Sequence, residues 1–208
     1  MSARIDKVVT SGVFSLDGED FDVDNNIWLI GDDSEVLVVD AAHEAGPIVQ
    51  AVAGRTVVGI VCTHGHNDHI NAVGELRDAL NAPVYLHPGD RMLWDAVYST
   101  ASPDRSLTDG DTITVAGTRL EVLNTPGHSP GSCSLYVPDL GVLFSGDTLF
   151  SGGPGATGRS YSDYDTIVES IASRLLSLPE DTVVHTGHGD DTTVGAEAPS
   201  LEDWKDRR

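Results

Sequence analysis

Four side chains that can bind a metal occur within six positions, at His64, His66, Asp68 and His69 in the segment THGHNDH. The segment follows the run TVVGIVC at 56–62, whose short, β-branched and apolar character predicts a buried strand. The apolar residues that come next recur at helical spacing, so the cluster lies at a strand-to-helix junction. Imidazole and carboxylate groups are costly to gather out of water unless a cation binds them. The sequence therefore predicts a metal site, and a fold that brings further ligands to the end of this strand.

Strand-like and helix-like segments occur in both halves of the chain, which predicts two sheets packed together with helices outside. We expect two short strands joined by a Gly-Asp-Asp turn in 26–40, and a polar loop in 99–112. The other expected strands cover 56–63, 82–87, 113–125, 132–137, 141–146 and 182–187. The expected helices cover 43–54, 69–80, 88–98 and 164–178. The fold class is therefore α/β, with one domain over residues 1–208, a length that suits one sizeable core.

Three more candidate ligands, His128, Asp147 and His188, each follow an expected strand and have glycine beside them. Glycine lets the backbone turn tightly and approach a bound ion closely. Imidazole and carboxylate ligands suit zinc, iron or manganese. A binuclear centre would place His64, His66 and His128 on one metal and Asp68, His69 and His188 on the other, with Asp147 between them. We expect two divalent metal ions, with zinc the first choice and iron or manganese as alternatives.

The strongly acidic composition limits which partners the chain can have. Twelve basic residues face 33 acidic ones, for a net charge of −21, and such a field repels phosphate backbones and anionic lipids. We therefore expect no nucleic-acid partner and no membrane partner. The N-terminal stretch lacks the apolar core of a signal peptide, which favours a cytoplasmic location. Cys62 and Cys133 lie in apolar strand segments and are interpreted as small buried hydrophobic residues.

Four motifs resemble, in order and over nearly the whole chain, the signature motifs of the metallo-β-lactamase superfamily: THGHNDH, GHSPGS, SGDTLF and GHG. The resemblance implies a four-layer αββα sandwich with a binuclear site at one edge. It also implies the ligand set given above, with Asp147 as the bridging residue. True β-lactamases of the superfamily generally lack an equivalent of Asp147, which makes antibiotic hydrolysis improbable. The superfamily's tRNA-processing ribonucleases need a basic surface, and the charge of this chain argues against that role.

The short, glyoxalase II-like thioester hydrolases are the members that the chain resembles best. The segment GDTLFSGGPGATGRSYSD at 146–163 is similar to their Gly-Arg-Ser/Thr-Asp segment, but it is longer and has Tyr161 where the family usually has aspartate. Arg159 is the candidate clamp for a substrate carboxylate, with a surface ion pair as the alternative. We expect Arg159 and Tyr161 to bind substrate. The expected substrate is a small acyl thioester of a low-molecular-weight thiol, and the oligomeric state stays open.

The expected reaction is attack of a metal-bridging hydroxide on the thioester carbonyl, with Asp68 as the catalytic residue that orients the hydroxide. A persulfide dioxygenase with one iron on His64, His128 and Asp147 is the second hypothesis, and a lactonase is the third. A metal-dependent structural module is the non-enzymatic alternative. We expect supporting roles for the remaining histidines (His43, His87 and His185), and we expect Asp40 to orient a ligand by accepting its hydrogen bond.

Overall fold

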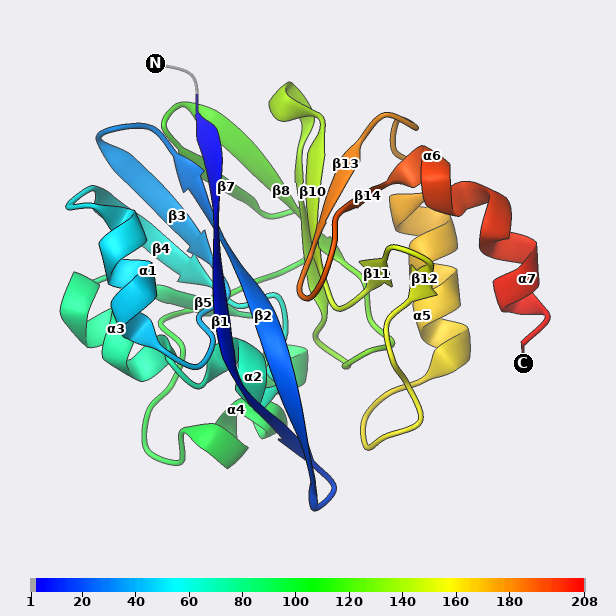
Figure 1. The fold of residues 1–208 in the computed structure, drawn as a ribbon, viewed down its shortest axis with the longest axis horizontal. Coiled ribbons are helices and arrows are strands. Elements are labelled where there is room, and N and C mark those ends of the chain that lie inside the picture. The colour runs from blue at the N-terminus through cyan, green and yellow to red at the C-terminus, as the bar shows by residue number, and fades with distance from the viewer. Residues whose placement is uncertain (1–2, 208) are drawn as a thin grey trace.

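Strands that are apolar on both faces build the centre of the molecule. In the computed structural model, which describes residues 3–207, β3 (Glu35–Val39) and β10 (Val142–Gly146) are buried along almost their whole length. Each lies inside a six-stranded sheet, and the two sheets pack face to face with helices on both outer sides (Figure 1). This is the αββα sandwich that the resemblance implied.

The first sheet has the strand order β1-β2-β3-β4-β5-β6. Its strands β1 to β3 are antiparallel, and β3 to β6 are parallel. Parallel neighbours need a crossover connection, which here is helical in each case. The strands are β1 (Arg4–Leu16), β2 (Glu19–Gly31), β3, β4 (Thr56–Val61), β5 (Val84–Leu86) and β6 (Arg105–Ser106). The helical connections are α1 (Ala45–Val52), α2 (Asn67–Ile70), α3 (Val73–Leu80), η1 (Pro88–Asp90) and α4 (Arg91–Val97).

The second sheet has the order β14-β13-β10-β9-β8-β7, in which β10 and β13 are parallel and the other pairs antiparallel. Its strands are β7 (Thr112–Val115), β8 (Thr118–Asn124), β9 (Cys133–Val137), β10, β13 (Val183–Thr186) and β14 (Thr192–Thr193). A small hairpin, β11 (Leu149–Phe150) and β12 (Gly153–Pro154), follows β10. The helical elements are η2 (Pro138–Leu140), α5 (Tyr164–Ser170), the π-helical turn η3 (Ile171–Leu175), α6 (Val194–Glu197), η4 (Ala198–Ser200) and α7 (Leu201–Lys205).

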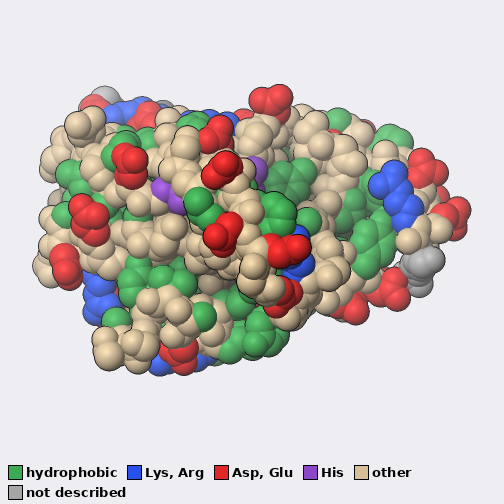
Figure 2. Space-filling view, turned by 60° about the horizontal axis from the view of Figure 1, so that its bottom comes forward, with side chains coloured by type: hydrophobic (Ala, Val, Ile, Leu, Met, Phe, Trp, Pro, Cys, Tyr) green, Lys and Arg blue, Asp and Glu red, His purple; other side chains and the backbone are tan. Residues whose placement is uncertain are grey.

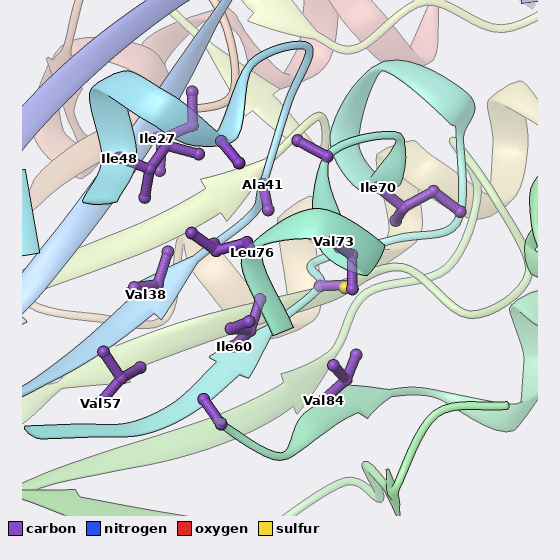
Figure 3. Close-up of a cluster of buried hydrophobic side chains, with 14 of the residues drawn as sticks. Ile27, Val38, Ala41, Ile48, Val57, Ile60, Ile70, Val73, Leu76 and Val84 are labelled. Atoms are coloured by element: carbon purple, nitrogen blue, oxygen red, sulfur yellow. The ribbon is translucent and has the colours of Figure 1, made fainter. Parts of the chain in front are cut away.

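Three clusters of buried apolar side chains hold the four layers together. Ile48 of α1 and Leu76 of α3 pack onto Ile60 of β4 and the neighbouring strands, which joins the first helical layer to its sheet (Figure 3). A second cluster, which includes Leu37 and Phe144, fills the space between the two sheets. The third cluster joins the second sheet to α5, η3 and α7. Each sheet thus buries both of its faces and each helical layer one, worth roughly 25 cal/mol per Å² of apolar surface removed from water.

The first sheet begins with a long hairpin that the sequence analysis did not predict. Its strands β1 and β2 pair from Arg4–Gly31 to Leu16–Glu19, and Asp17 and Gly18 at the turn have φ angles of 56° and 79°. Two successive positive φ angles are the geometry of a type I′ turn, which Asp-Gly favours. The distal end of the hairpin extends beyond the rest of the sheet, toward the loop that leads into α5 (Figure 1).

Most expected elements are present, and the differences concern their ends and interruptions. The helix expected over 69–80 is divided into α2 and α3, and the helix expected over 164–178 continues from α5 into the π-helical turn η3. The expected loop 99–112 contains the two-residue strand β6, and further elements follow His188. Within the described residues, the helices are too short or too polar to span a membrane.

Candidate metal centre

The seven predicted ligands meet at one edge of the sandwich, between the ends of strands from both sheets. His64, His66, Asp68 and His69 follow β4, and the last two belong to α2. The second sheet supplies the other three ligands, from the turn after β8 and from the ends of β10 and β13: His128, Asp147 and His188. Because β10 and β13 are parallel, their carboxyl ends lie at the same edge of the sheet. The fold therefore brings together residues that lie up to 124 positions apart in the chain.

The ligand atoms form three overlapping groups in which all members lie within 4.8 Å of one another: His64, His66 and His128; His64, His69 and Asp147; and Asp68, His69 and His188. The first and third groups are the two ligand triads that the sequence predicted. Asp147 lies between them, because its Oδ2 is 3.6 Å from Nε2 of His128 and 3.3 Å from Nε2 of His188. Its Oδ1 is 3.3 Å from Nε2 of His69.

Hydrogen bonds on the far side of three imidazole rings turn their Nε2 atoms toward the centre. Nδ1 of His69 lies 2.9 Å from the Asp40 carboxylate, which also accepts from the backbone and hydroxyl of Thr63. Nδ1 of His128 donates to the carbonyl of Ala156, and Nδ1 of His188 donates to the carbonyl of Asp24. When Nδ1 donates, a neutral imidazole presents its lone pair at Nε2. Asp40 therefore forms the expected hydrogen bond to a candidate ligand, and that ligand is His69.

Unpartnered atoms show that this donor set fits a cation. Among the described residues, five buried side-chain nitrogen or oxygen atoms have no hydrogen-bond partner, and four of them belong to predicted ligands: His64 Nε2, His66 Nε2, Asp68 Oδ1 and Asp147 Oδ1. A buried polar atom without a partner costs about 1–3 kcal/mol. A cluster that leaves four such atoms at one point is therefore built for a positively charged ligand that satisfies them.

The protonation states of the candidate ligands also indicate a site for cations. Burial lowers the pKa of His64 well below its usual value and that of His66 to about 3, so both rings are neutral. Burial also opposes the charged form of His188, but Asp147 and Asp68 outweigh it and raise its pKa to about 10. Burial opposes the charged form of Asp147 too, but His69 and His188 outweigh it and hold the pKa of that carboxyl well below its usual value. Without metal, protons on histidine thus neutralise carboxylates that divalent cations would otherwise neutralise.

A glycine beside the centre keeps the space that the bridging carboxylate needs. A Cβ atom on Gly187 would lie 2.1 Å from Oδ1 of Asp147 and 2.9 Å from the ring of His69. Any larger residue would therefore displace the carboxylate or the ring. The glycine that precedes His188 in the sequence is thus required by close packing against Asp147 and His69, a reason that the sequence analysis did not give.

Two residues of the site were missed by the sequence analysis. Asn25 on β2 is 1% exposed, and its Nδ2 lies 3.1 Å from Oδ2 of Asp68. Asp90, at the start of α4, is fully buried and accepts hydrogen bonds from the backbone of Gly65, the backbone of Gly131 and the hydroxyl of Ser129. It thereby ties the turn of His64 and His66 to the turn of His128. The glycines of these turns are visible in the sequence, but no local signal identifies the carboxylate that binds them.

The two predicted substrate contacts, Arg159 and Tyr161, lie in the loop before α5. Arg159 lines a small cavity of about 40 Å³ beside His66 and His128, and it also forms an ion pair with Glu19 at 2.6 Å. Its guanidinium stacks on Phe21 at 4.5 Å. Tyr161 is 55% exposed and has a φ of 71°. The structure thus places Arg159 next to the centre, held by the β1–β2 hairpin, while Tyr161 points to solvent.

The other residues singled out from the sequence have supporting positions. Nδ1 of His87 accepts from the backbone of Gly89, and His185 stacks on Trp28 with its ring bonded to Asp191. Cys62 and Cys133 are free and buried, as expected. Burial raises the pKa of the Cys133 thiol to about 12, so it is not a nucleophile at neutral pH.

One face of the molecule carries more acidic than basic side chains. Figure 2 shows this face, on which small patches of histidine also reach the surface. This distribution agrees with the net charge of −21 and favours the approach of cations over that of polyanions.

Sequence comparison identifies relatives along most of the chain. The probable metallo-hydrolase YqgX of Bacillus subtilis is 41% identical over 184 residues, covering 82% of this chain and 87% of the relative. The hydroxyacylglutathione hydrolase GloC of Haemophilus influenzae is 31% identical over 191 residues, covering 84% and 90%.

Solved structures with the same fold cover most of the chain. The B3 metallo-beta-lactamase BLEG-1 has a TM-score of 0.78 and 33% identity, covering 91% of this chain and 97% of that one. The di-iron form of TTHA1623 has a TM-score of 0.74 and 35% identity, covering 85% and 93%. ETHE1 from Myxococcus xanthus has a TM-score of 0.73 and 27% identity, covering 91% and 81%. The family model of the metallo-beta-lactamase superfamily matches residues 21–188, which include all seven predicted ligands, and the chain belongs to this superfamily.

Proposed function

We propose that the protein is a binuclear metal-dependent hydrolase that cleaves a small acyl thioester of a low-molecular-weight thiol. The observation that carries the proposal is the position of Asp147, whose two oxygens face different histidines on both sides of the centre. A carboxylate in that position can hold two cations together. The similarity to the hydroxyacylglutathione hydrolase GloC supports the thioester as substrate.

The residues of this chain divide the work in the proposed reaction. His64, His66 and His128 would hold one ion, Asp68, His69 and His188 the other, and Asp147 would bind both. Bound divalent cations would supply Lewis acidity and a water that ionises near neutral pH. Asp68 would orient the attacking water by accepting its hydrogen bond. Asp40 would keep the ring of His69 in place during the reaction, through the hydrogen bond at Nδ1.

The cavity beside the first histidine group supports a small acyl group. Its volume of about 40 Å³ is far below the roughly 300–1,000 Å³ of a pocket that encloses a whole ligand. Phe14 and Leu16 form an apolar wall opposite His66 and His128, and Arg159 supplies a positive charge. A substrate would therefore place a short acyl chain inside and extend its thiol carrier across the surface, where Arg159 can bind a carboxylate.

A persulfide dioxygenase is the second candidate, with one iron on His64, His128 and Asp147. The similarity to ETHE1 favours it. The two functions differ in metal content and in the need for oxygen. Metal analysis of the purified protein separates them, because the hydrolase needs two ions per chain, and the dioxygenase needs one iron and consumes oxygen with glutathione persulfide.

The thioesterase is tested with a panel of acyl thioesters on different thiols, comparing the metal-loaded wild type with Asp147→Ala. We expect the wild type to cleave at least one short-chain thioester, and the variant to lose at least about 100-fold in kcat/KM, since ligand loss exceeds the 10–100-fold cost typical of outer hydrogen-bond partners. Asp139→Ala, which removes an exposed carboxylate after β9, is the matched control and keeps the wild-type rate. The proposal is wrong if the loaded wild type cleaves none of the thioesters, or if Asp147→Ala cleaves as fast as the control.

A further inference from the structure

His43 and Asn25 form a pair beside the second ligand group. Nε2 of His43 lies 2.7 Å from Oδ1 of Asn25. On its other side, the Asn25 amide nitrogen lies 3.1 Å from Oδ2 of Asp68, 3.2 Å from Nε2 of His69 and 3.5 Å from Nε2 of His188. The amide of Asn25 therefore stands against all three ligands of that group, and His43 holds it from behind.

The direction of the hydrogen bonds follows from one backbone donor. The backbone N–H of His43 can only donate, so the atom of Asn71 that lies 2.5 Å from it is the amide oxygen. The amide nitrogen of Asn71 then donates to Nδ1 of His43, 3.3 Å away, which makes Nδ1 an acceptor. A neutral imidazole with an acceptor at Nδ1 carries its proton at Nε2. That proton is donated to Oδ1 of Asn25, so the amide nitrogen of Asn25 faces Asp68.

The orientation of Asn25 decides which oxygen of Asp68 is free. Oδ2 accepts from the amide, while Oδ1 is buried and has no hydrogen-bond partner. If the amide were reversed, its oxygen would face Oδ2 and the two acceptors would repel each other. The chain of bonds from Asn71 through His43 to Asn25 thus holds Oδ2 of Asp68 in place, 3.4 Å from Nε2 of His188 and 3.6 Å from Nε2 of His69.

The backbone around His43 is arranged to hold the imidazole ring in this place. His43 has a φ of 58°, a conformation that a non-glycine residue adopts only at some cost. The hydroxyl of Thr10 on β1 donates to the carbonyl of Ala42 and anchors the turn. On the same strand, Gly12 leaves room for the ring, because a Cβ there would lie 2.2 Å from Nδ1 of His43.

We propose that His43 is a positioning residue for the second metal, acting through Asn25 on Asp68. The inference rests on the ligand set of the proposed function, and it does not depend on which substrate is cleaved. Partners outside the ligand set of this kind typically change metal affinity by about 10–100-fold when they are removed. A role confined to anchoring the turn against β1 would change stability and leave the metal affinities as they are.

The hydrogen bonds from Asn71 through His43 and Asn25 to Asp68 form a relay, and two variants disrupt it in different ways. His43→Ala removes the ring. Gly12→Ala keeps every polar side chain of the relay, but the added Cβ would collide with the ring of His43 and displace it. His43→Gln is the conservative rescue, because its amide offers both a donor for Asn25 and an acceptor for Asn71. Gly46→Ala is the matched control, since a Cβ at Gly46 meets no atom within 4 Å.

The experiment titrates each metal-free protein with zinc against a competing chelator, and records cobalt(II) spectra of the same proteins. For His43→Ala and Gly12→Ala we expect the second binding step to weaken by about 10–100-fold with the first step unchanged, and the cobalt bands of the second site to change. His43→Gln and Gly46→Ala should keep both steps close to wild type. If the wild type binds two ions and both relay variants bind them equally well, the role of His43 is wrong. If the wild type binds one ion, the binuclear centre itself is wrong, and the inference falls with it.

Discussion

Asp90 shows how much one buried carboxylate contributes to the arrangement of the metal centre. Its three hydrogen bonds join the two turns that carry the first histidine group. Gly131 is needed for this contact, because a Cβ there would lie 2.8 Å from the Asp90 carboxylate. The positions of these two turns therefore depend more on the hydrogen bonds of Asp90 than on the volume of its side chain.

We therefore expect Asp90→Ala to lower the free energy of unfolding by about 2 kcal/mol or more, because it leaves the backbone N–H groups of Gly65 and Gly131 buried without a partner. Urea denaturation of the two proteins measures the difference. Asp95→Ala, which removes an exposed partner of Arg91, is the control and should stay within about 0.5 kcal/mol of wild type. A loss for Asp90→Ala that is no larger than for the control would contradict the network's role.

At the level of residues, the sequence predicted the side chains that lie together at the centre, and also Asp40 beside them, but it did not predict Asn25 or Asp90. Histidine and aspartate at HxHxDH spacing put several metal-binding groups on one short turn, so the segment from His64 to His69 pointed directly to metal binding. Asn25 and Asp90 have no such pattern. Their roles come from contacts with residues between 25 and 43 positions away (Asp68 for Asn25, Gly65 and Gly131 for Asp90), and such long-range contacts exist only in the folded chain.

At the level of elements, the β1–β2 hairpin and the loop before α5 act as one unit. The backbone N–H of Ser160 donates to Asp17 at the hairpin turn, and Arg159 pairs with Glu19 while it stacks on Phe21. On the inner side of the hairpin, the ring of Phe14 lies 5.2 Å from that of His66. The wall of the small cavity is therefore made by two segments that hold each other.

This arrangement gives a prediction about Arg159 that separates its two interpretations. If the Arg159–Glu19 pair holds the wall of the cavity, Glu19→Gln and Arg159→Gln should each raise KM for a cleaved thioester by several-fold, and the double variant should be no worse than either single one, because contacting residues are not additive. If Arg159 binds the substrate carboxylate instead, Glu19→Gln leaves KM unchanged. Glu121→Gln, from the distant pair with Arg119, is the control.

The sequence patterns predicted the apolar strands and the helices that alternate with them along the chain. They missed elements whose apolar pattern is weak. The first hairpin was missed although Asp17-Gly18 is a favourable turn, because its distal half mixes apolar residues such as Phe14 and Phe21 with polar ones and contributes nothing to the three apolar clusters. The division of the helix after His66 was also missed. The apolar spacing of 69–80 continues through the break at Asn71 and Ala72, where Ala72 bonds back to Ala41.

At the level of the whole molecule, the metal centre joins the two sheets. Four ligands come from the end of β4 in the first sheet, and three come from the second sheet. The chain also carries a net charge of −21, so its acidic groups repel one another in the compact state. Two divalent cations would offset four negative charges at the edge where the sheets meet.

Metal removal should therefore weaken the fold as well as the proposed activity. A ligand that binds the folded state alone stabilises it by RT ln(1 + [L]/Kd), about 4 kcal/mol per site at a thousandfold excess over Kd. We expect chelation to lower the urea midpoint, and zinc to restore it. In Asp147→Ala, which lacks the residue proposed to bind both ions, chelation should shift the midpoint less than in wild type. If metal analysis shows that both ions have been removed and the wild-type midpoint does not move, the cations are not what holds the two sheets together, and the interface between them is stable through its apolar core alone.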